Sequence, residues 1–337
     1  MTGAAYGTVL AGRGFVKPVS TNAGVRSAAA EAGRDGPSSG ASVTPSRLVV
    51  VVNRKARAGG ADLGPVLESL ADRLGPAEVL EVDDPAELAA KLEQACGDAV
   101  QRVVVAGGDG TINSVLPVLL RIGKPLGIIP LGTANDLART LGIPVDPAAA
   151  AAVILQDRKR RIDVGVVNGK HFVNAAGIGF STGLHRELTP RIKGVLGPLA
   201  YAIGVLRRWR RHEPFSVLVR TETSTLRRRV IQVTVANGRY YGGGMTAHEG
   251  ARIDDGSFDV VMILARPWWQ HLSSAIRLKR GVYANEGTIA AERASAFELS
   301  TRSPRTVATD GEPRTRTPAS FRVLPRALEV YVPDDAP

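Results

Sequence analysis

Short apolar runs alternate with amphipathic segments between residues 47 and 141, and no other feature of the sequence restricts the fold as much. Four runs have the length and composition of buried strands: 47–53 (RLVVVVN), 77–82 (AEVLEV), 102–110 (RVVVAGGDG) and 125–132 (PLGIIPLG). Apolar residues at helical spacing occupy the segments around them: 62–74, 85–95, 111–121 and 134–141. Strands that alternate with helices of this length predict βαβ units and a parallel sheet.

The apolar period changes to two after about residue 160, which is typical of half-buried strands. Asn168-Gly169 separates two such runs and predicts a tight β-hairpin. Further strand-like runs follow: 215–222, 228–237, 258–264, 296–301, 321–324 and 328–332. Helices are expected to interrupt them at 194–211 and at about 267–281. The second half therefore predicts a mainly antiparallel β-sandwich.

Composition narrows the choice of function. The chain has 43 Lys and Arg against 32 Asp and Glu, and its formal net charge is +11. Such an excess favours an anionic partner, which could be a nucleotide, a nucleic acid or an anionic membrane, although compositional bias alone also explains it. Cys96 is the one cysteine in the sequence, so neither an intrachain disulfide nor a cysteine zinc cluster can form. Residues 1–46 are rich in Gly, Ala, Ser, Thr and Pro and predict a disordered extension.

The first candidate site is the loop GGDGTIN at 107–113, which ends a predicted strand and opens a helix. Glycine lets the backbone approach a phosphate closely, and a helix N-terminus supplies N–H donors and the positive end of a dipole. The loop matches neither GxxxxGK[ST] nor GxGxxG. A plain strand-to-helix turn remains the alternative.

A second polar loop lies in IIPLGTANDLART (128–140), where Thr133, Asn135 and Asp136 follow a buried strand. Because both loops follow parallel strands, they share the carboxyl edge of the sheet, where ligands bind in such folds. Asn53 follows the first strand and joins the same edge. The sequence therefore predicts one nucleotide cleft, although Asn135 and Asp136 could also cap the next helix.

Together, GGDGTIN and PLGTANDLAR resemble the diacylglycerol kinase catalytic family, which includes sphingosine and ceramide kinases. The similarity continues through FVNAAGIGF (172–180), LGPLAY (196–201), VANGRYYGGG (235–244), ARIDDGSFDV (251–260) and DGE (310–312). The resemblance implies an α/β ATP-binding domain at 47–160, similar to that of NAD kinases, to which residues 325–333 return. It also implies a β-sandwich lipid-substrate domain at 161–324, with the nucleotide in the cleft between the two.

The resemblance also implies roles for particular residues. The residues expected at the ATP site are Asn53, Gly107, Gly108, Asp109, Gly110, Thr111, Asn113, Ser114, Gly132, Thr133, Asn135 and Asp136. A structural Mg²⁺ would be bound by the Asp255 side chain and the backbone carbonyls of Arg252 and Ser257. From spacing alone, an ordinary turn at Asp255-Gly256, before the strand at Phe258, is favoured over a metal site.

DGE at 310–312 resembles the catalytic segment of the family. Glu312 is the predicted general base, because a lipid hydroxyl is a weak nucleophile and a nearby carboxylate can accept its proton. Asp310 would orient it, and Asp109 is a further carboxylate near the phosphates. Whether Glu312 or Asp109 takes the proton stays open, and a hairpin turn is the alternative for this segment.

We therefore expect an ATP- and Mg²⁺-dependent lipid kinase that phosphorylates a hydroxyl of diacylglycerol or a related lipid. An NAD kinase-like enzyme shares GGDG but not PLGTANDLAR. A basic nucleic-acid-binding protein is the alternative from another class, and an aromatic content of 5% argues against it.

The expected location is cytoplasmic, with peripheral association to the inner face of an anionic membrane, and a homodimer is compatible with the sequence. No apolar run reaches the ~18 residues of a membrane span. RRWRRH (207–212) and RPWWQHL (266–272) combine Trp with Arg, as at a headgroup boundary, or else pack in the interior. No nucleic acid partner is expected.

Overall fold

The computed structural model describes residues 47–53, 62–82, 85–97, 100–180, 182, 213–246, 250–267, 270, 287–334 and 336. The predicted N-terminal extension, the predicted helix at 194–211 with LGPLAY and RRWRRH, and Trp268-Trp269 with nearly all of the second predicted helix lie outside these residues. Among the described helices, none combines the length and the apolar character needed to cross a membrane.

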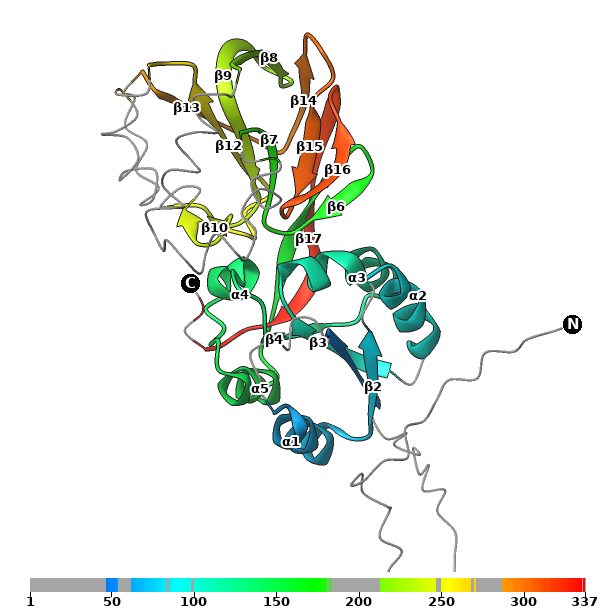
Figure 1. The fold of residues 1–337 in the computed structure, drawn as a ribbon. Coiled ribbons are helices and arrows are strands. Elements are labelled where there is room, and N and C mark those ends of the chain that lie inside the picture. The colour runs from blue at the N-terminus through cyan, green and yellow to red at the C-terminus, as the bar shows by residue number, and fades with distance from the viewer. Residues whose placement is uncertain are drawn as a thin grey trace, which may run out of the picture. The chain divides into compact units, whose positions relative to one another are not determined.

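The first half forms a parallel sheet with the strand order β2-β1-β3-β4 (Figure 1). Its strands are β1 (Arg47–Asn53), β2 (Ala77–Val82), β3 (Val100–Gly107) and β4 (Leu126–Pro130). The helices are α1 (Gly64–Leu74), α2 (Pro85–Ala95), α3 (Asp109–Ile122), α4 (Asp136–Thr140) and α5 (Pro147–Leu155). The predicted parallel sheet is therefore confirmed.

Helices cover both faces of this sheet. Since successive side chains of a strand point to opposite faces, each strand contributes to two cores. Val50 of β1 is fully buried in one core together with Leu70 of α1. Its neighbour Val51 is fully buried in a second core with Leu92 of α2 and Leu116 of α3. Continuous apolar strands such as RLVVVVN follow from this double coverage.

The second half is a predominantly antiparallel β-sandwich, as the sequence predicts. Its strands are β6 (Lys170–Phe172), β7 (Ala175–Gly179), β8 (Phe215–Arg220), β9 (Thr225–Ala236), β12 (Phe258–Leu264), β13 (Ile289–Ala294), β14 (Ala296–Thr301), β15 (Thr306–Thr309) and β16 (Glu312–Arg316). The short β10 (Tyr240–Tyr241) and β11 (Met245–Thr246) pair separately. Phenylalanines fill the interior: the rings of Phe297 and Phe321 stack with centroids 4.7 Å apart, and Phe258 meets Phe297 edge-on at 6.2 Å.

Two long strands join the halves. β5 (Lys159–Val167) pairs antiparallel with β17 (Ala319–Tyr331), and β17 also pairs parallel with β4 through Val330 and Leu126. The sequence predicts two strands, at 321–324 and 328–332. The structure instead has one strand with a register shift between Leu324 and Leu328, where Arg326 has a φ of 49°.

Several boundaries differ from the sequence-based ones. The Asn168-Gly169 hairpin is confirmed, and both residues have positive φ, as a type I′ turn requires. Helix α3 begins at Asp109, inside the glycine loop, rather than at Thr111. Helix α5 and strands β7, β10, β11, β13, β15 and β16 are absent from the sequence-based prediction. The alanine-rich α5 (PAAAAAVIL) has no polar face to mark a helical period, and the exposed edge strand β16 (EPRTR) has no apolar alternation.

Candidate active site

The two glycine loops meet at the carboxyl edge of the parallel sheet. Gly108 follows β3 and Gly132 follows β4. A Cβ on Gly132 would lie 2.6 Å from the Gly108 Cα, and a Cβ on Gly108 would lie 2.9 Å from the Gly132 Cα. Because real Cβ atoms do not approach that closely, both positions require glycine, and the loops contact one another backbone to backbone.

The first loop leads directly into α3. Gly108 is the N-cap and has no capping side chain, so the backbone itself opens the helix. Asn53 Nδ2 donates to Thr111 Oγ1 at 2.9 Å, which ties the end of β1 to this first turn. The Ser114 hydroxyl donates to the Gly110 carbonyl at 2.8 Å. Asn113 is 6% exposed, so the structure gathers these predicted residues at one turn but turns most of their side chains toward the protein.

The second loop is closed by its own asparagine. Asn135 Oδ1 accepts from the Gly132 N–H at 2.9 Å, and its Nδ2 donates to the Gly132 carbonyl at 2.8 Å. Asn135 has a φ of 51°, a conformation that asparagine tolerates better than most residues. Thr133 is exposed and lines the pocket beside the loop.

Asp109 and Asp136 connect these loops to the rest of the site. Asp109 accepts the N–H groups of Asp136 and Leu137 at 3.0 Å each, so it caps α4 from the other loop. Asp136 in turn accepts the N–H groups of Gly243 and Gly244, at 2.9 and 2.8 Å, in the turn between β10 and β11. Burial raises the pKa of Asp136, and the nearby charge of Asp109 raises it further.

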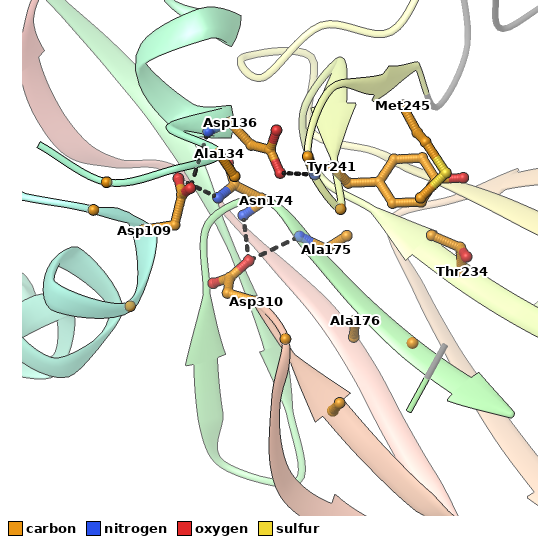
Figure 2. Close-up of a pocket in the computed structure, with 18 of the residues that line it drawn as sticks. Asp109, Ala134, Asp136, Asn174, Ala175, Ala176, Thr234, Tyr241, Met245 and Asp310 are labelled. Carbon is orange, nitrogen blue, oxygen red and sulfur yellow. Dashed lines mark hydrogen bonds between the residues drawn. The ribbon is translucent and has the colours of Figure 1, made fainter. Parts of the chain in front are cut away.

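A pocket of about 580 Å³ lies where these loops face the sandwich (Figure 2). One end is lined by Gly108, Asp109, Gly132 and Thr133. The other end is formed mainly by small residues of β7 and β15 and by groups from β9 to β11: Ala175, Ala176, Gly177, Thr234, Tyr241, Met245 and Ala308. A hydrogen bond joins the Tyr241 hydroxyl to Thr234, while burial raises the pKa of Tyr241 to about 12.

Asp310 lines this pocket from the turn between β15 and β16, with its carboxylate directed at the backbone of Asn174 and Ala175. Its Oδ1 accepts the N–H groups of Asn174 and Ala175 at 3.0 Å each, and its Oδ2 accepts that of Val173 at 3.1 Å. Burial raises the pKa of Asp310 to about 6, against the effect of these donors, and the charge of Asp109 adds to the rise. A carboxylate with such a pKa is suited to accept a proton near neutral pH.

Glu312 lies just outside the pocket, at the start of β16. Its side chain is half-exposed and pairs with Arg314 at 2.5 Å. Its Oε1 lies 3.8 Å from where a Cβ on Gly110 would be, so it faces the first turn of α3. The DGE segment thus brings both acids near the glycine loops: Asp310 lines the pocket, and the half-exposed Glu312 lies beside the first turn of α3.

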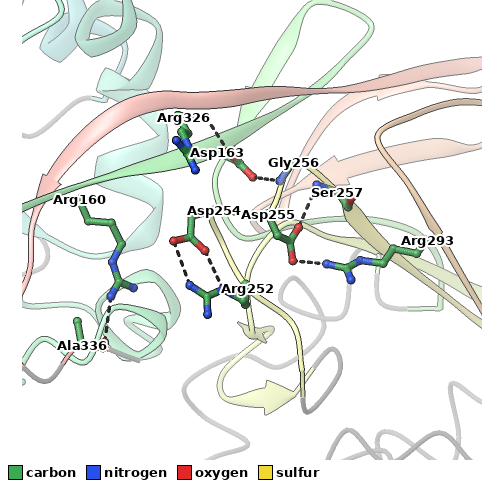
Figure 3. A network of polar contacts seen from close by, with 10 residues as sticks. All are labelled: Arg160, Asp163, Arg252, Asp254, Asp255, Gly256, Ser257, Arg293, Arg326 and Ala336. Atoms are coloured by element: carbon green, nitrogen blue, oxygen red, sulfur yellow. Dashed lines mark hydrogen bonds and ion pairs between the residues drawn. The ribbon is translucent and has the colours of Figure 1, made fainter.

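In the loop that resembles a structural Mg²⁺ site, the Asp255 carboxylate pairs with the side chain of Arg293 from β13 (Figure 3). Asp255 Oδ1 accepts the Ser257 N–H at 3.0 Å, and its Oδ2 forms an ion pair with Arg293. Arg252 pairs with Asp254 at 3.1 Å. Throughout the described ranges, no group of three or more His, Cys, Asp or Glu side chains could hold a metal. The Arg293 guanidinium thus occupies the carboxylate predicted to bind Mg²⁺, so Asp255 as paired here does not fit that ion.

Three buried residues of this region are absent from the sequence-based site. Asn174 donates from Nδ2 to Asp109 Oδ1 at 3.0 Å, and Asn237 Nδ2 donates to the carbonyls of Asp163 and Val173. Asp163, 1% exposed, accepts the N–H groups of Gly256 at 2.6 Å and Arg326 at 2.7 Å. Asn174 and Asn237 lie in FVNAAGIGF and VANGRYYGGG, so a search for polar residues within these apolar segments could have found them.

Comparison with known proteins covers both halves of the chain. Residues 47–167 match the family model described as the diacylglycerol kinase catalytic domain. Residues 177–332 match the model described as the YegS C-terminal NAD kinase beta sandwich-like domain.

Individual relatives agree with these matches. A protein named "Probable lipid kinase YegS-like" from Pseudomonas aeruginosa is 34% identical over 250 residues, which cover 73% of this chain and 81% of the relative. A diacylglycerol kinase from Bacillus subtilis is 30% identical, over 69% of this chain and 78% of the relative. A crystal structure of a diacylglycerol kinase from Bacillus anthracis superposes with a TM-score of 0.68 at 26% identity and covers 86% of this chain and 97% of that one.

Proposed function

This chain belongs to the diacylglycerol kinase family, and we propose that it transfers the γ-phosphate of ATP to a hydroxyl group of diacylglycerol or a related lipid. The observation that carries the proposal is one pocket in which two glycine loops face a carboxylate of raised pKa, Asp310. Lipid kinases share this requirement for a phosphate site beside a proton acceptor.

The phosphates of ATP would lie against the loops at Gly108 and Gly132. Where these two glycines meet, no side chain of theirs covers the backbone, and helix α3 begins there without a capping side chain. Backbone N–H groups and the helix dipole stabilise phosphate charge at such a position. ATP would enter as its magnesium complex, in which the ion neutralises charge on the phosphates.

Asp310 is our choice for the residue that accepts the proton of the lipid hydroxyl. It lines the pocket, whereas Glu312 is half-exposed and paired with Arg314. Three backbone donors orient the Asp310 carboxylate, and its pKa of about 6 leaves it mostly ionised at neutral pH. Glu312 would contribute charge near the first turn of α3 rather than take the proton.

The lipid would enter the pocket end lined by small residues of β7 and β15. Ala176 and Ala308 leave room for an acceptor, while Thr234 and Tyr241 supply hydroxyl groups beside it. The acceptor hydroxyl would then lie between this end and the phosphate loops, near Asp310.

Access to a membrane-borne substrate would involve an anionic membrane surface, at the inner face of a cytoplasmic membrane. The hairpin of β8 and β9 carries four exposed arginines: Arg220, Arg227, Arg228 and Arg229. Each basic residue near an anionic surface contributes about 1 kcal/mol to binding.

Liposome flotation tests this membrane association. The chain should float with anionic vesicles at low salt and be released at high salt, and no binding at low salt would contradict the proposal. A homodimer is compatible with the sequence, which leaves the oligomeric state open.

A panel of acceptors tests the proposed activity. Purified chain with Mg²⁺ and ATP labelled at the γ-phosphate should label diacylglycerol or a related lipid, and NAD and DNA serve as the competing acceptor and ligand. Phosphorylated NAD without a labelled lipid would favour the NAD kinase-like alternative. A salt-sensitive complex with DNA without ATP turnover would favour the nucleic-acid-binding alternative.

A further inference from the structure

We propose that Asn174 is a positioning residue of the phosphoryl-transfer site, which holds the carboxylates of Asp109 and Asp310 at a fixed separation across the pocket. The inference rests on the proposed function and assigns a role to a residue outside the predicted site.

Asn174 contacts both carboxylates with different parts of the residue (Figure 2). Its side-chain Nδ2 donates to Asp109 Oδ1 at 3.0 Å, and its main-chain N–H donates to Asp310 Oδ1 at 3.0 Å. Asp109 begins helix α3 on the phosphate loop, whereas Asp310 lies on the turn between two strands of the sandwich. A single residue therefore bridges a carboxylate of the α/β half and a carboxylate of the sandwich half.

The main chain of Asn174 is itself well anchored. Its carbonyl accepts the Asn237 N–H at 2.8 Å, and the Asn237 side chain donates to the neighbouring Val173 carbonyl at 2.8 Å. These bonds do not involve the Asn174 side chain, so a substitution there leaves them in place. Only the hydrogen bond to Asp109 depends on the side-chain amide.

The orientation of the amide follows from its partner. An ionised carboxylate only accepts hydrogen bonds, so the Nδ2 of Asn174 must face Asp109. Its Oδ1 then points the other way, buried and without a donor among the described residues. An unpaired buried acceptor is destabilising, and an apolar side chain of similar size would avoid that cost. Within the described part of the chain, the single hydrogen bond of the Asn174 side chain is thus the one that it donates to Asp109.

The reaction gives this arrangement a use. Asp109 caps α4 through Asp136 and Leu137, so it fixes the two phosphate loops relative to one another. Asn174 extends the same chain of bonds to Asp310, which makes the distance between phosphate and proton acceptor a property of three hydrogen-bonded residues. Misplacement of a catalytic group by about 1 Å can lower a rate 10²-fold.

Two substitutions test the proposal. Asn174→Leu keeps the size of the side chain and removes the donor, and Asn174→Asp keeps the shape and replaces the donor with a carboxylate. Both should lower kcat with the lipid by about 10²-fold. In Asn174→Leu the KM for ATP should stay within about threefold, because Asp109 keeps its bonds to the N–H groups of Asp136 and Leu137.

Asn168→Asp is the matched control. The Asn168 amide donates to Thr315 Oγ1 and to the carbonyls of Arg316 and Pro318, so its loss should lower the melting temperature and leave kcat unchanged. Melting temperatures of all variants separate folding from catalysis, and Asn174→Asp remains informative if Asn174→Leu does not fold.

The outcomes are distinct. Wild-type kcat in folded Asn174 variants, measured beside an active wild-type enzyme, would overturn the positioning role alone. A parallel rise in the KM for ATP of Asn174→Leu would also overturn it, because the residue would then act on nucleotide binding. Absence of lipid phosphorylation by the wild-type chain itself would overturn the proposed function and this inference with it.

Discussion

Gly108 and Gly132 contact each other so closely that a Cβ on Gly132 would lie 2.6 Å from the Gly108 Cα. The two residues follow neighbouring parallel strands, so this contact brings two loops of the sheet edge together. It explains why both loops contain glycine at these positions, and it creates the bare backbone surface that we assign to the phosphates.

Gly132→Ala should therefore separate the loops and weaken nucleotide binding by tenfold or more, about 1.4 kcal/mol. The added methyl would also lie 2.7 Å from Asn135 Oδ1, which closes the second loop. Titration with a fluorescent ATP analogue measures the effect. Gly97→Ala is the control, because its Cβ would meet nothing within 4 Å. Equal affinity in both variants would show that the loop contact does not shape the ATP site.

The pKa of Asp310 predicts the pH dependence of the reaction. A general base must be ionised, so kcat should fall as the pH drops through about 6, with a slope of about one per pH unit. A pH profile of kcat at saturating lipid and ATP tests this. Glu312→Gln should retain most of the turnover and the same decrease of kcat at low pH. If that decrease disappears in this variant, Glu312 and not Asp310 is the general base.

The same raised pKa has a consequence for stability. The folded protein binds the Asp310 proton more tightly than the unfolded chain, whose aspartates titrate near 3.8, so this group's contribution to the free energy of unfolding declines between pH 4 and about 6. Asp310→Asn should remove that part of the pH dependence. Urea unfolding at several pH values measures it, and an unchanged profile in the variant would mean that Asp310 titrates normally.

Asp163 should contribute strongly to stability without taking part in the reaction. It is 1% exposed and accepts the N–H groups of Gly256 and Arg326, at the loop before β12 and at the register shift of β17. Asp163→Ala would leave both donors without an acceptor and cost about 2–4 kcal/mol. Chemical denaturation should show this loss, and the Asp254→Ala variant on the more exposed side of the same loop should lose far less.

The ion pair of Arg293 with Asp255 predicts that removal of metal ions leaves the fold unaffected. The guanidinium already neutralises the carboxylate, so a chelator should not change the melting temperature of the wild-type chain. In Arg293→Met, the freed carboxylate could bind a divalent ion, and Mg²⁺ should then raise the melting temperature. A wild-type chain that melts lower in chelator would show that a metal does stabilise it.

The secondary structure of a segment is predictable from the sequence where its apolar residues recur with a clear period. The parallel strands and their helices are predictable because both faces of the sheet are covered, which leaves long apolar runs such as RLVVVVN beside clear helical periods. Helix α5 is not, because its row of alanines has no polar face. The two runs at the end of the chain read as separate strands, because Pro325 and Arg326 interrupt the alternation at a register shift that only the pairing with β5 reveals.

The residues of the site also differ in how far the sequence predicts them. The glycine loops are visible in the sequence, because each combines a strand end, a glycine turn and polar residues. The role of Asn174 is not, because it depends on contacts with Asp109, 65 residues away, and Asp310, 136 residues away. The preference for Asp310 over Glu312 also comes from tertiary structure, since both acids lie in one short turn and only their surroundings differ.

The most direct test of the account is lipid phosphorylation by the purified wild-type chain and by Asp310→Asn, side by side, with diacylglycerol in mixed micelles, Mg²⁺ and ATP labelled at the γ-phosphate. We predict labelled phosphatidic acid from the wild-type chain. We predict at least about 10²-fold slower formation by the variant, which should still bind an ATP analogue. Equal rates from the two proteins, or no labelled lipid from the wild-type chain, would contradict the account.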